Sequence, residues 1–104
     1  MGIDVELINE RQEAKLAIHD PQMFLTTLAT KEWWQLNESK CLRFIDPWGD
    51  TIFNQAQVPI LLAELEHSAA LQTDPGTKAH LEQVCRLVAA AKGEGHTYVK
   101  FIGD

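Results

Sequence analysis

The chain has 104 residues and a formal net charge of −6, from 15 acidic and 9 basic residues. This length is typical of one domain, and a composition of 45% hydrophobic and 23% charged residues excludes an intrinsically disordered chain. The acidic balance disfavours nucleic-acid and anionic-membrane surfaces, because both need clustered Lys and Arg. We therefore expect a single domain over residues 1–104, with no nucleic-acid or membrane partner.

No stretch approaches the 18 or more consecutive apolar residues of a membrane span, and residues 1–6 lack the basic and apolar regions of a signal peptide. On these grounds we expect a cytoplasmic protein. Cys41 and Cys85 each stand among apolar residues. In that compartment, two buried reduced thiols are expected instead of a disulfide.

The first predicted element is a β-hairpin. Residues 3–8 alternate, with Ile3, Val5 and Leu7 on one side, and residues 14–19 alternate again after a polar stretch. A period of two predicts half-buried strands. The alternative is one helix over residues 7–19, because the run Glu-Arg-Gln-Glu-Ala-Lys favours a helix.

A short helix is predicted next, over residues 21–30. Asp20 can cap free backbone N–H groups, and Pro21 suits the first helical position. This helix places Phe24, Leu25 and Leu28 on one face. Residues 31–40 follow without a clear pattern.

A second hairpin is predicted around the turn Asp46-Pro47-Trp48-Gly49-Asp50. Residues 41–45 alternate, with Leu42 and Phe44 on one face, and residues 51–53 read as a short returning strand. A loop of this length is common in hairpins.

Two long helices and a final strand complete the chain. Apolar residues recur at helical spacing over residues 55–71, with Asn54 as the N-cap, and over residues 75–92, with Gly93 as the C-cap. The short break between them predicts an antiparallel pair. With the alternating residues 96–102, the order becomes ββαββααβ. This order predicts an α+β fold: an antiparallel or mixed sheet of about five strands with three helices packed on it.

The turn at residues 46–50 has two interpretations. In the local one, Asp46 bonds its own turn, Pro47 fixes φ and Gly49 supplies a positive φ. In the functional one, Asp46 and Asp50 bind a divalent cation, or Trp48 meets a partner. A calcium loop is disfavoured, because the spacing lacks alternating oxygen ligands and a distal Glu. Hairpin geometry does not require Trp48 or Asp50, so any function of the turn is expected there.

No catalytic or metal-binding motif is visible elsewhere. Glu64 and His67 match one Glu-x-x-His unit of di-iron bundles, but no second copy exists, so a solvated helix face is expected. The histidines lack zinc spacing, and no nucleophile elbow or glycine-rich phosphate loop occurs. The sequence therefore predicts no catalytic residue, no metal ligand and no cofactor.

The tryptophans are the other unusual feature. Trp33 and Trp34 are adjacent, so they diverge by about 100° on a helix and point to opposite sides of a strand. An exposed tryptophan is a favoured interface anchor. The alternative is a ring that lies over the edge of the core with its N–H satisfied. We predict a partner-binding surface formed by Trp33, Trp34, Trp48 and Asp50.

Residues 44–54, Phe-Ile-Asp-Pro-Trp-Gly-Asp-Thr-Ile-Phe-Asn, resemble a segment of small uncharacterised bacterial proteins in which it precedes a Leu-rich helix. The resemblance implies a bacterial source and carries no activity and no catalytic residue. In size, acidity and lack of motifs, the chain is also similar to immunity proteins that neutralise bacterial toxins, an analogy of class.

These observations predict a non-catalytic interaction protein of the immunity or inhibitor type, with a protein partner of basic charge. The alternative is a small-molecule or divalent-metal site near the second hairpin, using Asp46, Asp50 and a histidine. A homodimer that serves as a structural module is a third reading.

Overall fold

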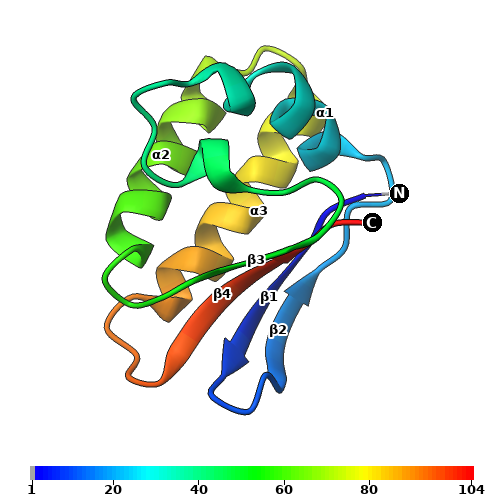
Figure 1. The fold of residues 1–104 in the computed structure, drawn as a ribbon. Helices are drawn as coiled ribbons and strands as arrows, with labels where there is room; N and C mark the ends of the chain where they lie inside the picture. Colours follow the sequence, from blue (N-terminus) through cyan, green and yellow to red (C-terminus); the bar gives the residue numbers. More distant parts are fainter. Residues whose placement is uncertain (1) are drawn as a thin grey trace.

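Four strands form one antiparallel sheet, and three helices pack on one of its faces (Figure 1). This computed structural model describes residues 2–104. The strands lie in the order β2-β1-β4-β3, where β1 is Asp4–Asn9, β2 is Ala14–Ile18, β3 is Asp50–Phe53 and β4 is Thr97–Ile102. The predicted α+β class is confirmed, but the sheet has four strands instead of about five.

The first hairpin is confirmed, and the alternative helix over residues 7–19 is wrong. β1 and β2 pair antiparallel, with Val5 opposite Ile18, and the register shifts between Leu7 and Ile8. The polar residues between the strands form a turn in which Asn9 Oδ1 accepts hydrogen bonds from the backbone N–H groups of Arg11 and Glu13. These local bonds satisfy the backbone in a turn and leave nothing for a continuous helix.

Helix α1 spans Phe24–Lys31, so it begins three residues later than predicted. The delay follows from a turn in which the N–H of Met23 bonds the carbonyl of Asp20 at 3.1 Å, with Met23 in the left-handed region at φ 60°. Leu25 and Leu28 are buried as expected.

The prediction of a second hairpin around residues 46–50 is wrong. Residues 41–45 form no strand: Leu42–Phe44 is a 3₁₀ helix, η2, and another, η1, spans Trp33–Gln35. β3 pairs with β4 instead, with Thr51 opposite Phe101. Both 3₁₀ helices belong to the segment of residues 32–49 between α1 and β3, which we call the connector.

Helices α2, Val58–Leu71, and α3, Pro75–Ala91, form the predicted antiparallel pair (Figure 1). Asn54 Oδ1 accepts from the N–H of Gln57 just before α2, and Asp74 caps α3 by accepting from the N–H of Thr77. The C-cap of α3 is Lys92, so Gly93 lies one position beyond its predicted place, with the positive φ of 81° that glycine favours after a helix.

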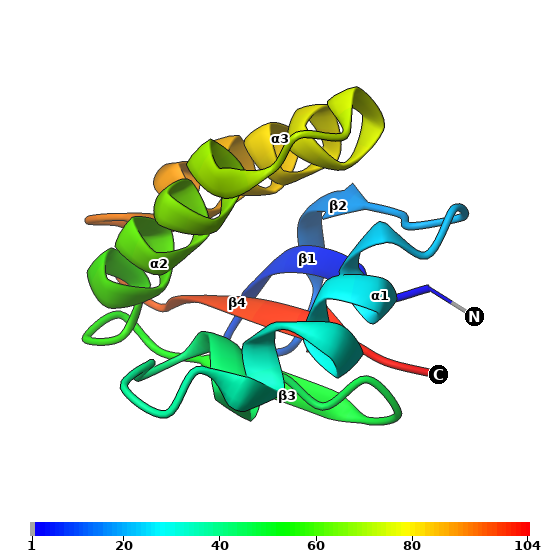
Figure 2. The ribbon, with the colours of Figure 1, turned by 90° about the horizontal axis from the view of Figure 1, so that it is seen from above.

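The core lies between the helices and the sheet. The alternating residues Thr97, Val99 and Phe101 of β4 face it, and the Phe101 ring meets Phe53 edge-on at 5.8 Å between centroids. Seen from above, α3 lies on the side of β2, whereas the connector lies on the side of β3 (Figure 2). No helix within residues 2–104 has the length and hydrophobicity needed to cross a membrane.

Candidate interaction surface

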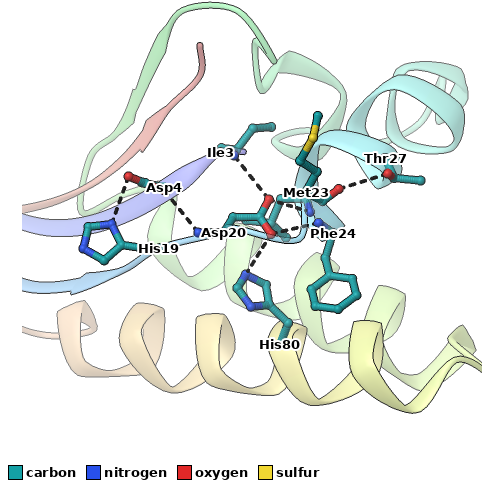
Figure 3. A network of polar contacts seen from close by, with 9 residues as sticks. Ile3, Asp4, His19, Asp20, Met23, Phe24, Thr27 and His80 are labelled. Carbon is teal, nitrogen blue, oxygen red and sulfur yellow. Dashed lines mark hydrogen bonds and ion pairs between the residues drawn. The ribbon is translucent and has the colours of Figure 1, made fainter. Parts of the chain in front are cut away.

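Asp20 anchors the segment that leads into α1. Its carboxylate is buried and accepts hydrogen bonds from three backbone N–H groups: Ile3 at 3.2 Å, Phe24 at 2.8 Å and Leu25 at 3.0 Å (Figure 3). The N–H groups of Phe24 and Leu25 lie in the first turn of α1 and have no acceptor within the helix. Asp20 accepts from both and so caps the helix as predicted, although α1 starts only at Phe24. Asp20 thereby ties α1 to the strand end at Ile3.

His80 of α3 lies on the other side of the same carboxylate, with Nε2 at 3.6 Å from Asp20 Oδ1 (Figure 3). That nitrogen is buried and has no hydrogen-bond partner among the described residues. The imidazole also packs against the Phe24 ring at 5.4 Å between centroids. The pair thus joins α3 to the start of α1.

Glu64 of α2 holds the connector in place. Its carboxylate accepts from the backbone N–H groups of Lys40, Cys41 and Leu42 at 2.7–3.0 Å and from the Ser39 hydroxyl at 2.9 Å. Burial raises the pKa of the Glu64 carboxyl, but these bonds outweigh burial and leave the pKa below its ordinary value. The predicted solvated face therefore holds for the exposed His67 but not for Glu64.

Trp33 is fully buried, and its Nε1 donates to Ser68 Oγ at 3.1 Å. It therefore belongs to the core, and the expectation that it forms part of an exposed binding surface is corrected. Trp34, the next residue, is 47% exposed. Successive residues of a helical turn point in different directions, so one tryptophan enters the core and the other faces outward.

Trp34 and Trp48 meet on the surface. Their ring centroids are 5.3 Å apart and the planes cross at 68°, in an edge-to-face arrangement. Trp48 is 61% exposed. We call Trp34 and Trp48 the aromatic pair; they come from η1 and from the turn that follows η2, so the fold of the connector brings them together.

The turn that carries Trp48 is held from two directions. Asp46 Oδ1 accepts from the N–H of Trp48 at 2.9 Å, as the local interpretation predicted. The local interpretation also predicted a positive φ at Gly49, and this prediction is wrong. Glycine fits there for a different reason, because a Cβ would lie only 2.7 Å from Asp46 Oδ2. The N–H of Gly103 donates to the carbonyl of Gly49 at 2.8 Å, which fixes the turn to the chain after β4.

The two carboxylates of the turn are engaged separately. Asp50 Oδ2 lies 3.6 Å from Lys100 Nζ across the β3–β4 pair, whereas Asp46 bonds its own turn. Within residues 2–104, no group of three or more His, Cys, Asp and Glu side chains lies close enough to hold a metal ion. The geometry therefore gives the metal version of the alternative function no support.

Neither cysteine is poised as a nucleophile. Burial, and then the Glu64 carboxylate, raises the pKa of Cys41 to about 11. Burial, followed by the carboxylates of Glu66 and Glu82, raises the pKa of Cys85 to about 11. Both are free thiols, and only the thiolate is a strong nucleophile. Cys41 is buried as expected, while Cys85 is partly exposed.

A groove of about 680 Å³ runs between the connector and α2. We define it by Leu36 and Leu42 on the connector side and by Ala63, His67 and Leu71 on α2. The sequence did not reveal this groove, because its two walls are brought together by the bonds of Glu64 to residues more than 20 positions away.

Comparison of the chain with protein-family models, with curated proteins and with solved structures finds no match. The resemblance of residues 44–54 to small bacterial proteins stays a prediction.

Proposed function

We propose that the chain is a non-catalytic interaction module that binds a basic partner protein through the aromatic pair. The observation that carries this proposal is the exposed edge-to-face contact between Trp34 and Trp48. Tryptophan is among the residues most enriched at binding hot spots, because its large ring gains much when a partner removes it from water.

Charge supports a basic partner. The formal charge of −6 attracts cations at long range and speeds their encounter with the surface. Trp48 also stands between Asp46 and Asp50 in the chain. A tryptophan face is the best aromatic partner for Arg or Lys. The Asp46 carboxylate adds negative charge beside Trp48, whereas Asp50 is already paired with Lys100. An immunity or inhibitor protein of a bacterial cytoplasm is the concrete form of this proposal.

The test is affinity capture from cells of the native source with the wild-type chain, a Trp34→Ala/Trp48→Ala variant and a Leu16→Ala control. Leu16 is 49% exposed on β2, so the control removes a similarly exposed apolar side chain at the opposite edge of the sheet. We expect a basic protein that the wild type and the control enrich and the tryptophan variant does not. Truncation of a hot spot costs about 2 kcal/mol, roughly a thirtyfold loss of affinity. Equal enrichment by all three chains would show that the aromatic pair is not part of the interface.

A further inference from the structure

The α2 wall of the groove is a straight stripe. Ala63, His67 and Leu71 are spaced by four residues, so they lie along one face of the helix. At a rise of about 1.5 Å per residue, this stripe is about 12 Å long, slightly more than two turns of a helix laid beside it. The groove volume of about 680 Å³ lies in the range of natural binding sites, roughly 300–1,000 Å³.

The groove presents apolar surface. Leu36 is 41% exposed and Leu71 is 65% exposed, on opposite walls, with Trp33 and Leu42 buried beneath them. Burial of such side chains by a ligand is favourable at roughly 25 cal/mol per Å² of apolar area. An occupant with apolar side chains fits between these walls.

The polar groups of the groove floor are already satisfied. Glu64 accepts four hydrogen bonds from the connector, and Ser68 Oγ accepts from Trp33. They therefore offer little directional bonding to a polar ligand. Specificity must come from the rim.

The rim is acidic. Glu32 and Glu38 border the groove, both are exposed, and neither forms an ion pair within residues 2–104. No Lys or Arg lines the groove in the described part of the chain. Two carboxylates without an ion-pair partner beside the apolar groove favour a ligand that carries positive charge next to apolar groups.

We propose that the groove binds a short basic amphipathic helix. Its apolar side chains, spaced at i and i+4, enter between Leu36 and Leu71, and its Lys or Arg side chains pair with Glu32 and Glu38. Neither tryptophan of the aromatic pair lines this groove. The proposal goes beyond the aromatic pair and does not depend on it.

The probe is a designed peptide with Leu at the i, i+3, i+4 and i+7 positions and Lys elsewhere, titrated calorimetrically at about 0.1 M salt to limit long-range attraction. A Leu-Glu peptide of the same pattern is the matched ligand control. We expect the Leu-Lys peptide to bind and the Leu-Glu peptide not to bind. Equal binding of both peptides, or binding of neither, would overturn the proposal.

Matched protein variants separate the groove from general charge. Glu32→Lys/Glu38→Lys and the control Glu82→Lys/Glu94→Lys each add four charges, so both change the net charge from −6 to −2. We expect about a tenfold loss of affinity in the groove variant and less than about threefold in the control. Equal losses would mean attraction to the acidic chain as a whole and would refute the groove.

The apolar contact and the position of the peptide are tested in the same assay. Leu71→Ser is expected to weaken binding, whereas Ile60→Ser, on the same helix and 38% exposed, is not. Changes in backbone amide chemical shifts in NMR should cluster at Ala63, His67 and Leu71.

The same variants distinguish the groove from the aromatic pair. If Trp34→Ala/Trp48→Ala abolishes peptide binding and Leu71→Ser does not, the peptide lies on the aromatic pair, and the groove proposal fails while the proposed function stands. Shifts in the groove with hexylamine but not with the peptide would assign a small amine ligand instead.

Discussion

Asp20 Oδ1 lies 3.6 Å from His80 Nε2, and both atoms are shut away from solvent. The contact places the start of α1 against α3, while the same carboxylate bonds the chain at Ile3. One side chain therefore links the first strand, the first helix and the last helix.

Removal of the Asp20 carboxylate should destabilise the fold. Asp20→Ala leaves three backbone N–H groups without their acceptor, so we expect a loss of about 3 kcal/mol or more in the free energy of unfolding. Asp20→Asn keeps one acceptor oxygen and should lose less. Urea denaturation followed by circular dichroism measures both, with Asp50→Ala as an exposed control. A loss below about 0.5 kcal/mol in Asp20→Ala would contradict the network.

Glu64 should make the free energy of unfolding depend on pH in the acid range. Its pKa in the folded chain is lowered from 4.5, so its ionised form is stabilised by folding. That contribution is complete above the unfolded pKa and is lost as the pH falls through the folded pKa. We expect Glu64→Gln to flatten the decline of the urea midpoint below about pH 4.5 and to leave the alkaline side unchanged. An unaltered acid profile would refute the role of its hydrogen bonds.

Both thiols should resist alkylation in the folded protein. With pKa values of about 11, Cys41 and Cys85 remain almost entirely protonated at pH 8. Iodoacetamide labelling followed by mass spectrometry should be slow in buffer and fast in urea. Because Cys85 is partly exposed and Cys41 is buried, any label in the folded state should appear first on Cys85.

The three tryptophans should separate spectroscopically. In Trp34→Phe/Trp48→Phe, the remaining Trp33 is buried, so its emission should be blue-shifted and poorly quenched by acrylamide. The aromatic pair should give an exciton couplet in circular dichroism that disappears equally in Trp34→Phe and Trp48→Phe. A couplet that survives either substitution would show that the rings do not touch in solution.

Gln55 offers a test of the junction between α3 and β4. Its Nε2 donates to the carbonyls of Ala91 and Thr97 at 2.9 and 2.8 Å. Gln55→Glu keeps the shape but turns a donor into a carboxylate that faces two carbonyl oxygens. We expect a loss of about 2 kcal/mol or more in urea denaturation. Gln72→Glu, which loses a single bond within one helix turn, is the milder control.

Local patterns in the sequence were sufficient for β1, β2, β4 and both long helices. Their apolar periods are clean, and the polar residues at their ends bond the neighbouring backbone, as with Asp74 and Thr77. These elements are specified by residues a few positions apart. Asp20 bonds free N–H groups at the start of α1, as predicted, although the helix starts three residues later. The predicted N-cap role of Asn54 is wrong, because α2 also starts three residues later, with Gln57 as its N-cap.

The connector could not be predicted in the same way. Residues 41–45 alternate like a strand, yet the N–H groups of Cys41 and Leu42 bond Glu64 and not a neighbouring strand. As a result Leu42 is buried and Phe44 is 56% exposed, although a strand would place them on one face. The aromatic pair was found only as separate exposed tryptophans, because nothing in the spacing of Trp34 and Trp48 indicates that they touch.

The sheet order has a consequence for biosynthesis. β4 is central, pairing with β1 on one side and β3 on the other, but it is synthesised after every other described element. Contacts between strands so distant in the chain form slowly, because a long loop must close first. While residues 97–102 are still inside the ribosome, the edge of β1 that β4 later covers is unpaired, and an unpaired strand edge promotes aggregation. Translation must therefore release the last strand before the nascent chain is protected.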